Sequence, residues 1–442
     1  MAATLLPVHL EDAPTDTFRR QLAALHEHAG SLATWLEPAP LGGTVPGDVS
    51  AVVVPDMSGV AYRRLADLQD LDVPILVVTS EFGTVSMWDW EIRDYLRRRS
   101  VQTVAPTSAE EFRDLCRALG LRERLRGARM LAYQDDLGAG MQPDIFKRFY
   151  WWEDECVADL EARFGLSVEH RSYRELAARA KAVPEDRVTD ELRRIAATVP
   201  MPGLAPCAQR DAVRMYLALH DEVDETPDAV AVGVNCLNES ASATTTPCLA
   251  FDLLYEERGL LWGCEADLTS MLTEIFVDKS LNSPVMMTNL YPFLMGQAAL
   301  KHEGIPFFPE VPDHPENHVL VAHCGYFGEI PRTCAAEWAC RPPVLEIIDE
   351  NAHAIDARFP EGPTTLVKIA SDLTTLTVCP AELTGYVQYE DSDCLNGGVL
   401  RVEDGFRFVE SIPSHHTVLT TGDQVRRLQL VGEVLGLDVV RI

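Results

Sequence analysis

A single switch in hydrophobic pattern constrains the fold of this 442-residue chain most strongly. Up to about residue 283, short apolar runs alternate with amphipathic stretches. Beyond that point the apolar runs stay short and turn residues become frequent. Strand–helix alternation predicts a parallel sheet with helices on both faces, whereas many short strands predict an antiparallel sandwich or barrel. We therefore expect an α/β architecture that gives way to a mostly β one.

The first third of the chain contains several strong strand signals. "SAVVVPDM" (50–57) and "PILVVTSE" (74–81) are typical of buried strands, and "QTVAP" (102–106) is a shorter one. Between them, "MWDWEIRDYLRRR" (87–99) has helical apolar spacing and a basic end, which predicts a helix.

A second α/β unit is expected to begin near Arg129 with the strand "RMLAYQDD". Residues 144–165 predict one long helix that ends at a glycine, and 187–199 and 208–223 predict two more helices. The strands "DAVAVGVNCL" and "GLLWGCEADL" then both run out into polar residues. Chemistry gathers beyond the carboxyl ends of strands in open α/β sheets, so these two ends are favoured places for a site.

The chain from Pro284 onward predicts a β-rich, barrel-like region, closed by a helix over 423–436 and a last strand. A chain of this length exceeds a single ordinary core. We predict an N-terminal α/β domain over 1–128 and a second α/β domain over 129–283 that carries part of the active site. A C-terminal β-rich domain over 284–442 is expected to complete the site.

Composition excludes some classes of partner. The net charge of −30 argues against nucleic acid or an anionic membrane, both of which need basic patches. No apolar run is long enough to span a membrane, and the first residues lack the pattern of a signal peptide. The eleven cysteines are scattered, odd in number and form no CxxC pair, which predicts reduced thiols and a cytoplasmic location.

Four segments place polar residues where strands end: "NCLNES", "GCEAD", "VLVAHCG" and "SHHTVLTTGD". Carboxylates and imidazoles together are ligands for a borderline metal such as Mn²⁺, Fe²⁺, Co²⁺ or Zn²⁺. We therefore consider a metal site built from some of these candidates, which are Glu239, Glu265, Asp267, His323, His415 and His416.

Some of these residues also have plain structural interpretations. Asp267 stands where it would cap a helix that begins near Leu268. His323 follows an apolar run, as a hydrogen-bonded core histidine would. His415 and His416 are adjacent, so in a strand their side chains would point opposite ways, leaving one at the surface or behind the other.

The order of these motifs resembles the L-fucose/L-arabinose isomerase-like family. The matching segments are "CLNE" (236–239), "TPCLAFDLLYEERGLLWGCEAD" (246–267), "HVLVAHCG" (318–325) and "HHTVLTTGD" (415–423). "FGLSVEHRSYREL" (164–176) also resembles the second domain of that family.

The resemblance implies a fold of two Rossmann-like, doubly wound α/β domains followed by a β-rich domain. It also implies homo-oligomers, often trimers or hexamers, with active sites between domains. Family members isomerise aldoses and ketoses through an ene-diol and bind a divalent metal, typically Mn²⁺, through two carboxylates and a histidine. A sugar or a small polyhydroxylated molecule would be the substrate.

Carried over residue by residue, Glu265 matches the first acidic ligand, which can also transfer protons, and His416 matches the C-terminal histidine ligand. His323 falls where arabinose-type members place a histidine, as a metal ligand or a substrate contact. Glu239 and Cys248 match positions in the pocket wall, where Glu239 is a second catalytic candidate. His415 is a further candidate for substrate binding.

The chain departs from the family at the second acidic ligand. The pattern after the next strand, "SPVMMTNLYPF", aligns Asn289 with that acid. An amide offers a neutral oxygen, which binds a hard cation weakly and cannot act as a base. Either Asp267 or another acid compensates, or the metal is weak, different or absent. The alternatives are therefore a lyase, epimerase or biosynthetic enzyme on the same fold, or a non-catalytic sugar-binding protein.

Overall fold

The structure is a computed structural model of the chain, and it describes residues 2–57, 61–78, 89–136, 144–237, 242–345, 349–390, 392 and 394–442. Two compact units are distinguished, and each is described by itself. The first comprises 1–126, 279–282 and 426–439, and the second comprises 127–278, 283–425 and 440–442.

The first unit is built on a parallel sheet in the order β2-β1-β4-β5-β6, with β3 also paired to β1. Its strands are β1 (Ala3–His9), β2 (Ala33–Trp35), β3 (Ala39–Pro40), β4 (Ala51–Val54), β5 (Ile75–Val77) and β6 (Thr103–Val104). Its helices are α1 (Asp16–Ala29), α2 (Leu65–Gln69), α3 (Asp89–Arg97), α4 (Ala109–Leu125) and most of α14 (Val425–Leu435). All residues of β4 and β5 are buried, as expected for strands covered on both faces.

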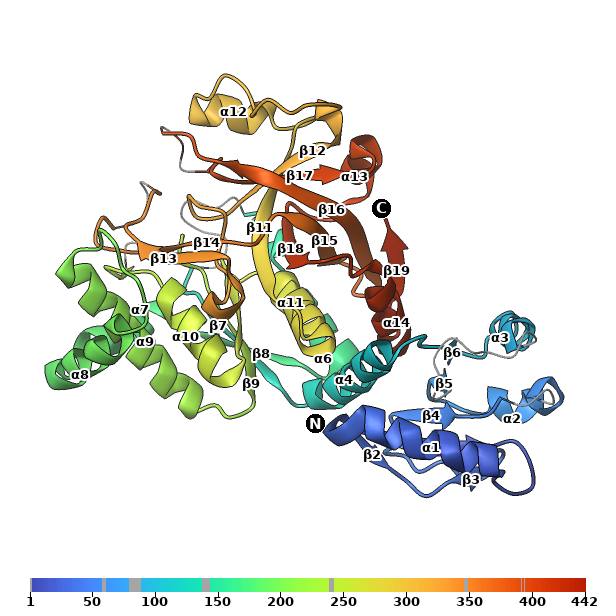
Figure 1. The fold of residues 1–442 in the computed structure, drawn as a ribbon. Helices are drawn as coiled ribbons and strands as arrows, with labels where there is room; N and C mark the ends of the chain where they lie inside the picture. The colour runs from blue at the N-terminus through green and yellow to red at the C-terminus, as the bar shows by residue number, and fades with distance from the viewer. Residues whose placement is uncertain are drawn as a thin grey trace. The chain divides into compact units, whose positions relative to one another are not determined.

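The second unit opens with a parallel sheet in the order β10-β9-β7-β8 (Figure 1). Its strands are β7 (Arg129–Tyr133), β8 (Ser167–Arg171), β9 (Ala229–Val234) and β10 (Leu261–Cys264). The helices of this part are α5 (Phe146–Phe149), α6 (Asp154–Phe164), α7 (Tyr173–Ala182), α8 (Glu185–Ala196), α9 (Pro206–Asp224), α10 (Cys248–Arg258) and most of α11 (Leu268–Leu281). Strands β9 and β10 are buried throughout, although β10 lies at the edge of this sheet.

Six antiparallel strands of the same unit close into a barrel in the order β15-β18-β11-β12-β17-β16, with β16 pairing back to β15 and β19 added beside β16. These strands, yellow to red in Figure 1, are β11 (Val285–Pro292), β12 (His318–Ala322), β15 (Gly362–Ile369), β16 (Thr375–Val387), β17 (Gly397–Val402), β18 (His416–Thr421) and β19 (Asp438–Arg441). A hairpin of β13 (Glu337–Arg341) and β14 (Ala354–Arg358) and the short helices α12 (Gln297–Glu303) and α13 (Gly405–Ser411) complete the unit.

The chain is therefore a mixed α/β protein with two parallel sheets and a closed antiparallel barrel, which confirms the predicted fold class in this coarse form. The strands expected over 50–57 and 228–237 and the strand expected within "SPVMMTNLYPF" (283–293) are present as β4, β9 and β11. Within the described ranges, none of the helices combines the length and the apolar character needed to cross a membrane.

The long helix predicted over 144–165 is wrong, because the structure divides it into α5 and α6. Trp151 adopts a left-handed φ of 65° between them. Two tertiary hydrogen bonds stabilise the break between the helices. Trp152 Nε1 donates to the carbonyl of Ala266 at 2.8 Å, and the Leu268 amide donates to the Tyr150 carbonyl at 3.1 Å. These bonds outweigh the local helix preference of the segment. The break also brings Tyr150 to the site described next.

Candidate metal centre

Glu265 occupies a strained turn at the carboxyl end of β10. Glu265 and Ala266 have left-handed φ values of 54° and 51°, and the Asp267 amide closes the turn by donating to the Cys264 carbonyl at 3.2 Å. Such backbone is costly for residues with a side chain and is found where function requires it. The described residues include eight non-glycine positions of positive φ, and four of them, namely Trp151, Glu265, Ala266 and Cys324, surround this centre.

The barrel brings two histidines to the Glu265 carboxylate. His416 is the first residue of β18, and His323 follows β12. One ligand atom from each of Glu265, His323 and His416 lies within 4.8 Å of the other two, and all three residues are buried. His416 Nε2 is 3.6 Å from Glu265 Oε1. Segments that are up to 151 residues apart in sequence (416 minus 265) therefore converge on one point.

Asp267 caps the following helix and also orients His416. Its Oδ1 accepts from the Ser270 amide at 2.8 Å and from the Thr269 hydroxyl at 2.9 Å, which caps α11. Its Oδ2 lies 2.9 Å from His416 Nδ1 and 3.5 Å from Lys368 Nζ. An ionised carboxylate only accepts hydrogen bonds, so His416 Nδ1 donates and Nε2 faces Glu265. Asp267 is thus both a helix cap and a part of the site. It supports His416 from behind and is not a member of the three-residue cluster.

Electrostatics keep both carboxylates of the turn ionised despite their burial. Burial alone would raise the pKa of Glu265, but the hydrogen bond from His416 and the charges of His416 and His323 hold the pKa below its usual value. Burial opposes ionisation of Asp267 as well, while Lys368 and His416 lower its pKa. The pKa of His416 is raised, because its bonds to Asp267 and Glu265 outweigh the effect of burial.

Tyr150 joins this centre and was not predicted. Its ring stacks on that of His416 at 4.5 Å with an interplanar angle of 2°, and its hydroxyl is 3.4 Å from Nε2 of both His415 and His416. Burial, followed by the charges of Glu265 and Asp267, raises the pKa of Tyr150, so the hydroxyl keeps its proton. The run of four aromatic residues "FYWW" inside an otherwise polar helical stretch was the available signal.

Lys368 is a second residue that sequence reasoning missed. It lies in β15 with 1% of its surface exposed, and its ammonium donates to the Ser270 hydroxyl at 2.6 Å as well as approaching Asp267. Lysine is almost never fully buried without a partner. A lysine inside the apolar run "TTLVKIA" was therefore a recognisable sign of a buried carboxylate nearby.

Three further residues were predicted to belong to the site, and the structure does not place them in the three-residue cluster. Asn289 pairs with His416 across β11 and β18, and its Oδ1 is buried without a hydrogen-bond partner among the described residues. Cys248 is buried at the start of α10. Glu239 lies outside the described residues.

The expectation that His415 and His416 point opposite ways is wrong. Their ring centroids are 4.4 Å apart, and both rings approach the Tyr150 hydroxyl. Strand alternation does not apply, because β18 begins only at His416. His416 is buried whereas His415 is exposed, so only the second of the pair belongs to the cluster.

A cavity of about 410 Å³ opens beside the centre. Its lining mixes aromatic, hydroxyl and cationic groups, and comprises Arg148, Phe149, Trp151, Thr269, Lys368, Ile369, Ser371, Pro413, Ser414 and His415. Such a volume suits a small ligand. The lining includes chain neighbours of Tyr150 and His416, but not Glu265, His323 or His416 themselves.

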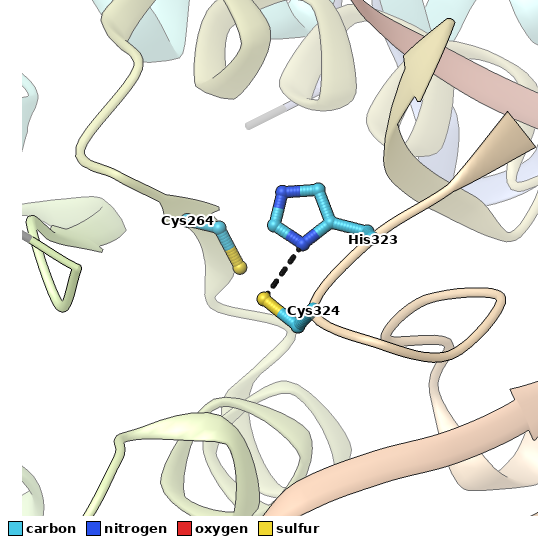
Figure 2. Close-up of side chains that lie close together, drawn as sticks. All are labelled: Cys264, His323 and Cys324. Carbon is cyan, nitrogen blue, oxygen red and sulfur yellow. Dashed lines mark hydrogen bonds between the residues drawn. The ribbon is translucent and has the colours of Figure 1, made fainter. Parts of the chain in front are cut away.

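His323 also lies beside two cysteines, Cys264 and Cys324 (Figure 2). Its Nδ1 lies 2.9 Å from Cys324 Sγ, and Cys264 lies beside them. The hydrogen bond from Cys264, and then the charge of His323, lower the pKa of the Cys324 thiol against the effect of burial. His323 Nε2 is buried and has no hydrogen-bond partner in the part of the chain that the structure describes.

No model of a known protein family matches this chain, and no curated protein matches it either. The resemblance to sugar isomerases therefore rests on the motifs quoted above. The proposed function therefore depends on the chemistry of Glu265, His323 and His416.

We predict that Asp267→Asn destabilises the protein by about 3–5 kcal/mol at neutral pH, because it leaves Lys368 buried without its counter-charge. The pKa of Asp267 is lower in the folded chain than in the unfolded one, so its ionised form stabilises the fold above the ordinary aspartate pKa. That contribution disappears as the pH falls through the folded pKa, and the difference between variant and wild type should shrink in acid. Urea unfolding at several pH values measures both effects.

Asp404→Asn is the matched control for this measurement. Asp404 caps α13 by accepting from the Arg407 amide at 3.0 Å, and asparagine caps a helix as well as aspartate does. We expect a change within about 0.5 kcal/mol. Equal losses in the two variants would mean that Asp267 is only a helix cap.

Proposed function

We propose that this chain is a metal-dependent, aldose–ketose isomerase-like enzyme that acts on a sugar or a small polyhydroxylated substrate through an ene-diol. The convergence of the ligand atoms of Glu265, His323 and His416 within 4.8 Å is the observation that carries this proposal. The motif resemblance supports the same reaction class.

The residues present fit a divalent cation. Two imidazoles and a carboxylate are a donor set for borderline metals. The buried Nε2 of His323 has no partner among the described residues, and such an orphaned group calls for an explanation, of which a missing ion is one. Asp267 holds the His416 ring by Nδ1 and leaves Nε2 for a ligand role, as carboxylates behind metal-binding histidines do. Glu265, His323 and His416 would hold the ion.

When bound, the ion would polarise two neighbouring oxygens of the substrate and stabilise negative charge that develops on them. Glu265 is the proposed base, since its ionised carboxylate can take a proton from one carbon and return it to the next. The Tyr150 hydroxyl, which keeps its proton, is placed to donate a hydrogen bond to a substrate oxygen or to Glu265. The neighbouring cavity, with its hydroxyl and cationic lining, suits a polyhydroxylated molecule.

The donor set differs from the one that the resemblance implies. The family uses two carboxylates and one histidine, whereas this cluster has one carboxylate and two histidines. A site rich in imidazole generally binds Fe²⁺, Co²⁺ and Zn²⁺ more tightly than Mn²⁺. We propose Mn²⁺ on the strength of the resemblance, with these three ions as competitors.

Several further features of the resemblance are part of the same proposal. They are the doubly wound, Rossmann-like character of the two parallel sheets, the three-domain division at 128/129 and 283/284, and a homo-oligomer, as a trimer or hexamer. A cytoplasmic location and a small-molecule partner rather than nucleic acid or membrane complete it. The strongly acidic composition supports the last point.

A second candidate is an enzyme that keeps this pocket and runs different chemistry, as a lyase, an epimerase or a biosynthetic enzyme. Asn289 favours it, because the amide sits opposite His416 where an acid was expected and its Oδ1 is buried without a partner among the described residues. Asn289 can bind a substrate oxygen or an ion but cannot accept a proton as a base. A non-catalytic sugar-binding protein is the third candidate, and the ionised, strained Glu265 speaks against it.

We predict that the purified protein binds one Mn²⁺ per chain at this cluster and that Glu265→Gln weakens the binding at least about tenfold. The substitution keeps the shape of the side chain and removes its charge. Metal analysis and isothermal titration measure the stoichiometry and the affinity. Glu410→Gln, on the exposed surface of α13, is the matched control and should leave both unchanged. A fully folded Glu265→Gln protein with wild-type affinity would rule out this cluster as the Mn²⁺ site.

Exchange of the C2 hydrogen separates the two enzymatic candidates. For an isomerase, the metal-loaded protein in deuterium oxide should incorporate solvent deuterium at C2 of an aldose or ketose, and Glu265→Gln should abolish the incorporation. Nuclear magnetic resonance of a panel of free sugars reads the exchange directly. Metal binding without exchange on any sugar of the panel would favour the second candidate.

A further inference from the structure

Cys264, His323 and Cys324 form a second cluster that the proposed isomerase chemistry does not use. One ligand atom of each lies within 4.8 Å of the other two. Figure 2 shows both sulfur atoms on the same side of the His323 ring, with Nδ1 joined to Cys324 Sγ at 2.9 Å. The two clusters draw on neighbouring residues, because Cys264 precedes Glu265 and Cys324 follows His323.

The backbone around Cys264, His323 and Cys324 fixes the positions of their side chains. Cys264 ends β10 and is buried. Cys324 adopts a left-handed φ of 54° in a turn closed in both directions: the His323 amide donates to the Tyr326 carbonyl at 3.0 Å, and the Tyr326 amide donates back at 3.1 Å. A cysteine in this conformation is costly unless its side chain is needed in one place. Here the strained turn directs the sulfur toward His323 Nδ1.

The donor set points to a different class of ion from the first cluster. Two sulfurs and one imidazole nitrogen select thiophilic metals, of which Zn²⁺ is the common divalent one. Three protein ligands leave the fourth position of a tetrahedral ion open, as in catalytic rather than structural zinc sites. We propose that Cys264, His323 and Cys324 form a binding site for Zn²⁺ that is distinct from the Glu265 site.

His323 connects the two sites through its two nitrogens. With Nδ1 turned toward Cys324, Nε2 is the nitrogen left for the cluster with Glu265 and His416. Figure 2 shows this second nitrogen on the far side of the ring from both sulfurs. Sulfur-bound Zn²⁺ would thus fix the orientation of the His323 ring. The Zn²⁺ site does not require the isomerase proposal to be correct.

Cobalt substitution under reducing conditions tests the proposal on the full-length protein. Co²⁺ bound by thiolates gives sulfur-to-cobalt charge-transfer absorption, which oxygen and nitrogen ligands do not give. We expect this absorption in the wild type, its loss in Cys264→Ala and in Cys324→Ala, and its displacement by Zn²⁺. Zn²⁺ affinity, measured by chelator competition, should fall at least about tenfold in both variants.

Two further variants make the result specific. Cys116→Ala replaces a buried cysteine in α4 of the first unit and should leave the charge-transfer absorption intact. Glu265→Gln should keep this absorption while losing the other ion, so that failure of either site is visible separately. If the cysteine variants do not fold, X-ray absorption of the Zn²⁺-loaded wild type still counts sulfur ligands.

Three results would overturn the proposal. They are a wild type saturated with Co²⁺ that lacks charge-transfer absorption, an absorption that survives loss of either cysteine, and a zinc spectrum without sulfur neighbours. A disulfide between Cys264 and Cys324 that persists in the presence of reductant would be a fourth such result, because neither sulfur could then bind an ion.

Discussion

The hydrogen bond between Asp267 and His416 is the interaction on which the candidate centre depends. It joins the turn after β10 to the first residue of β18, across 149 positions of sequence. Because Asp267 also caps α11 and approaches the buried Lys368, the same carboxylate fixes a helix, a barrel strand and an imidazole ring. Removing its charge would therefore affect both the fold and the chemistry of the site.

Strain and burial are concentrated around this bond. The turn at Glu265 and Ala266, the break at Trp151 and the turn at Cys324 all use left-handed backbone that side chains disfavour. These three turns position the Glu265 carboxylate, the Tyr150 ring and the Cys324 thiol, respectively. The fold thus stabilises costly local geometry through its large buried core, a distribution typical of functional sites.

Part of the fold and part of the candidate site could be predicted from the sequence, and the rest could not. Continuous apolar runs predicted β4 and β9, because strands buried on both faces leave little freedom in pattern. Polar residues at strand ends pointed to Glu265, His323 and His416, which the structure brings together. The broken helix and Tyr150 escaped prediction, since they depend on bonds to Ala266 and Leu268 more than 100 residues away. Asp267 could not be assigned one role, because its two oxygens have different partners.

Anomalous diffraction from crystals of the Mn²⁺-loaded protein is the most direct test of the site formed by Glu265, His323 and His416, since it locates the ion without relying on activity. A single Mn²⁺ peak is expected within bonding distance of a Glu265 carboxylate oxygen and of His416 Nε2, with His323 as the third ligand. His416 Nδ1 should remain bonded to Asp267. A loaded protein whose Mn²⁺ lies elsewhere, with Glu265, His323 and His416 free of it, would contradict the account.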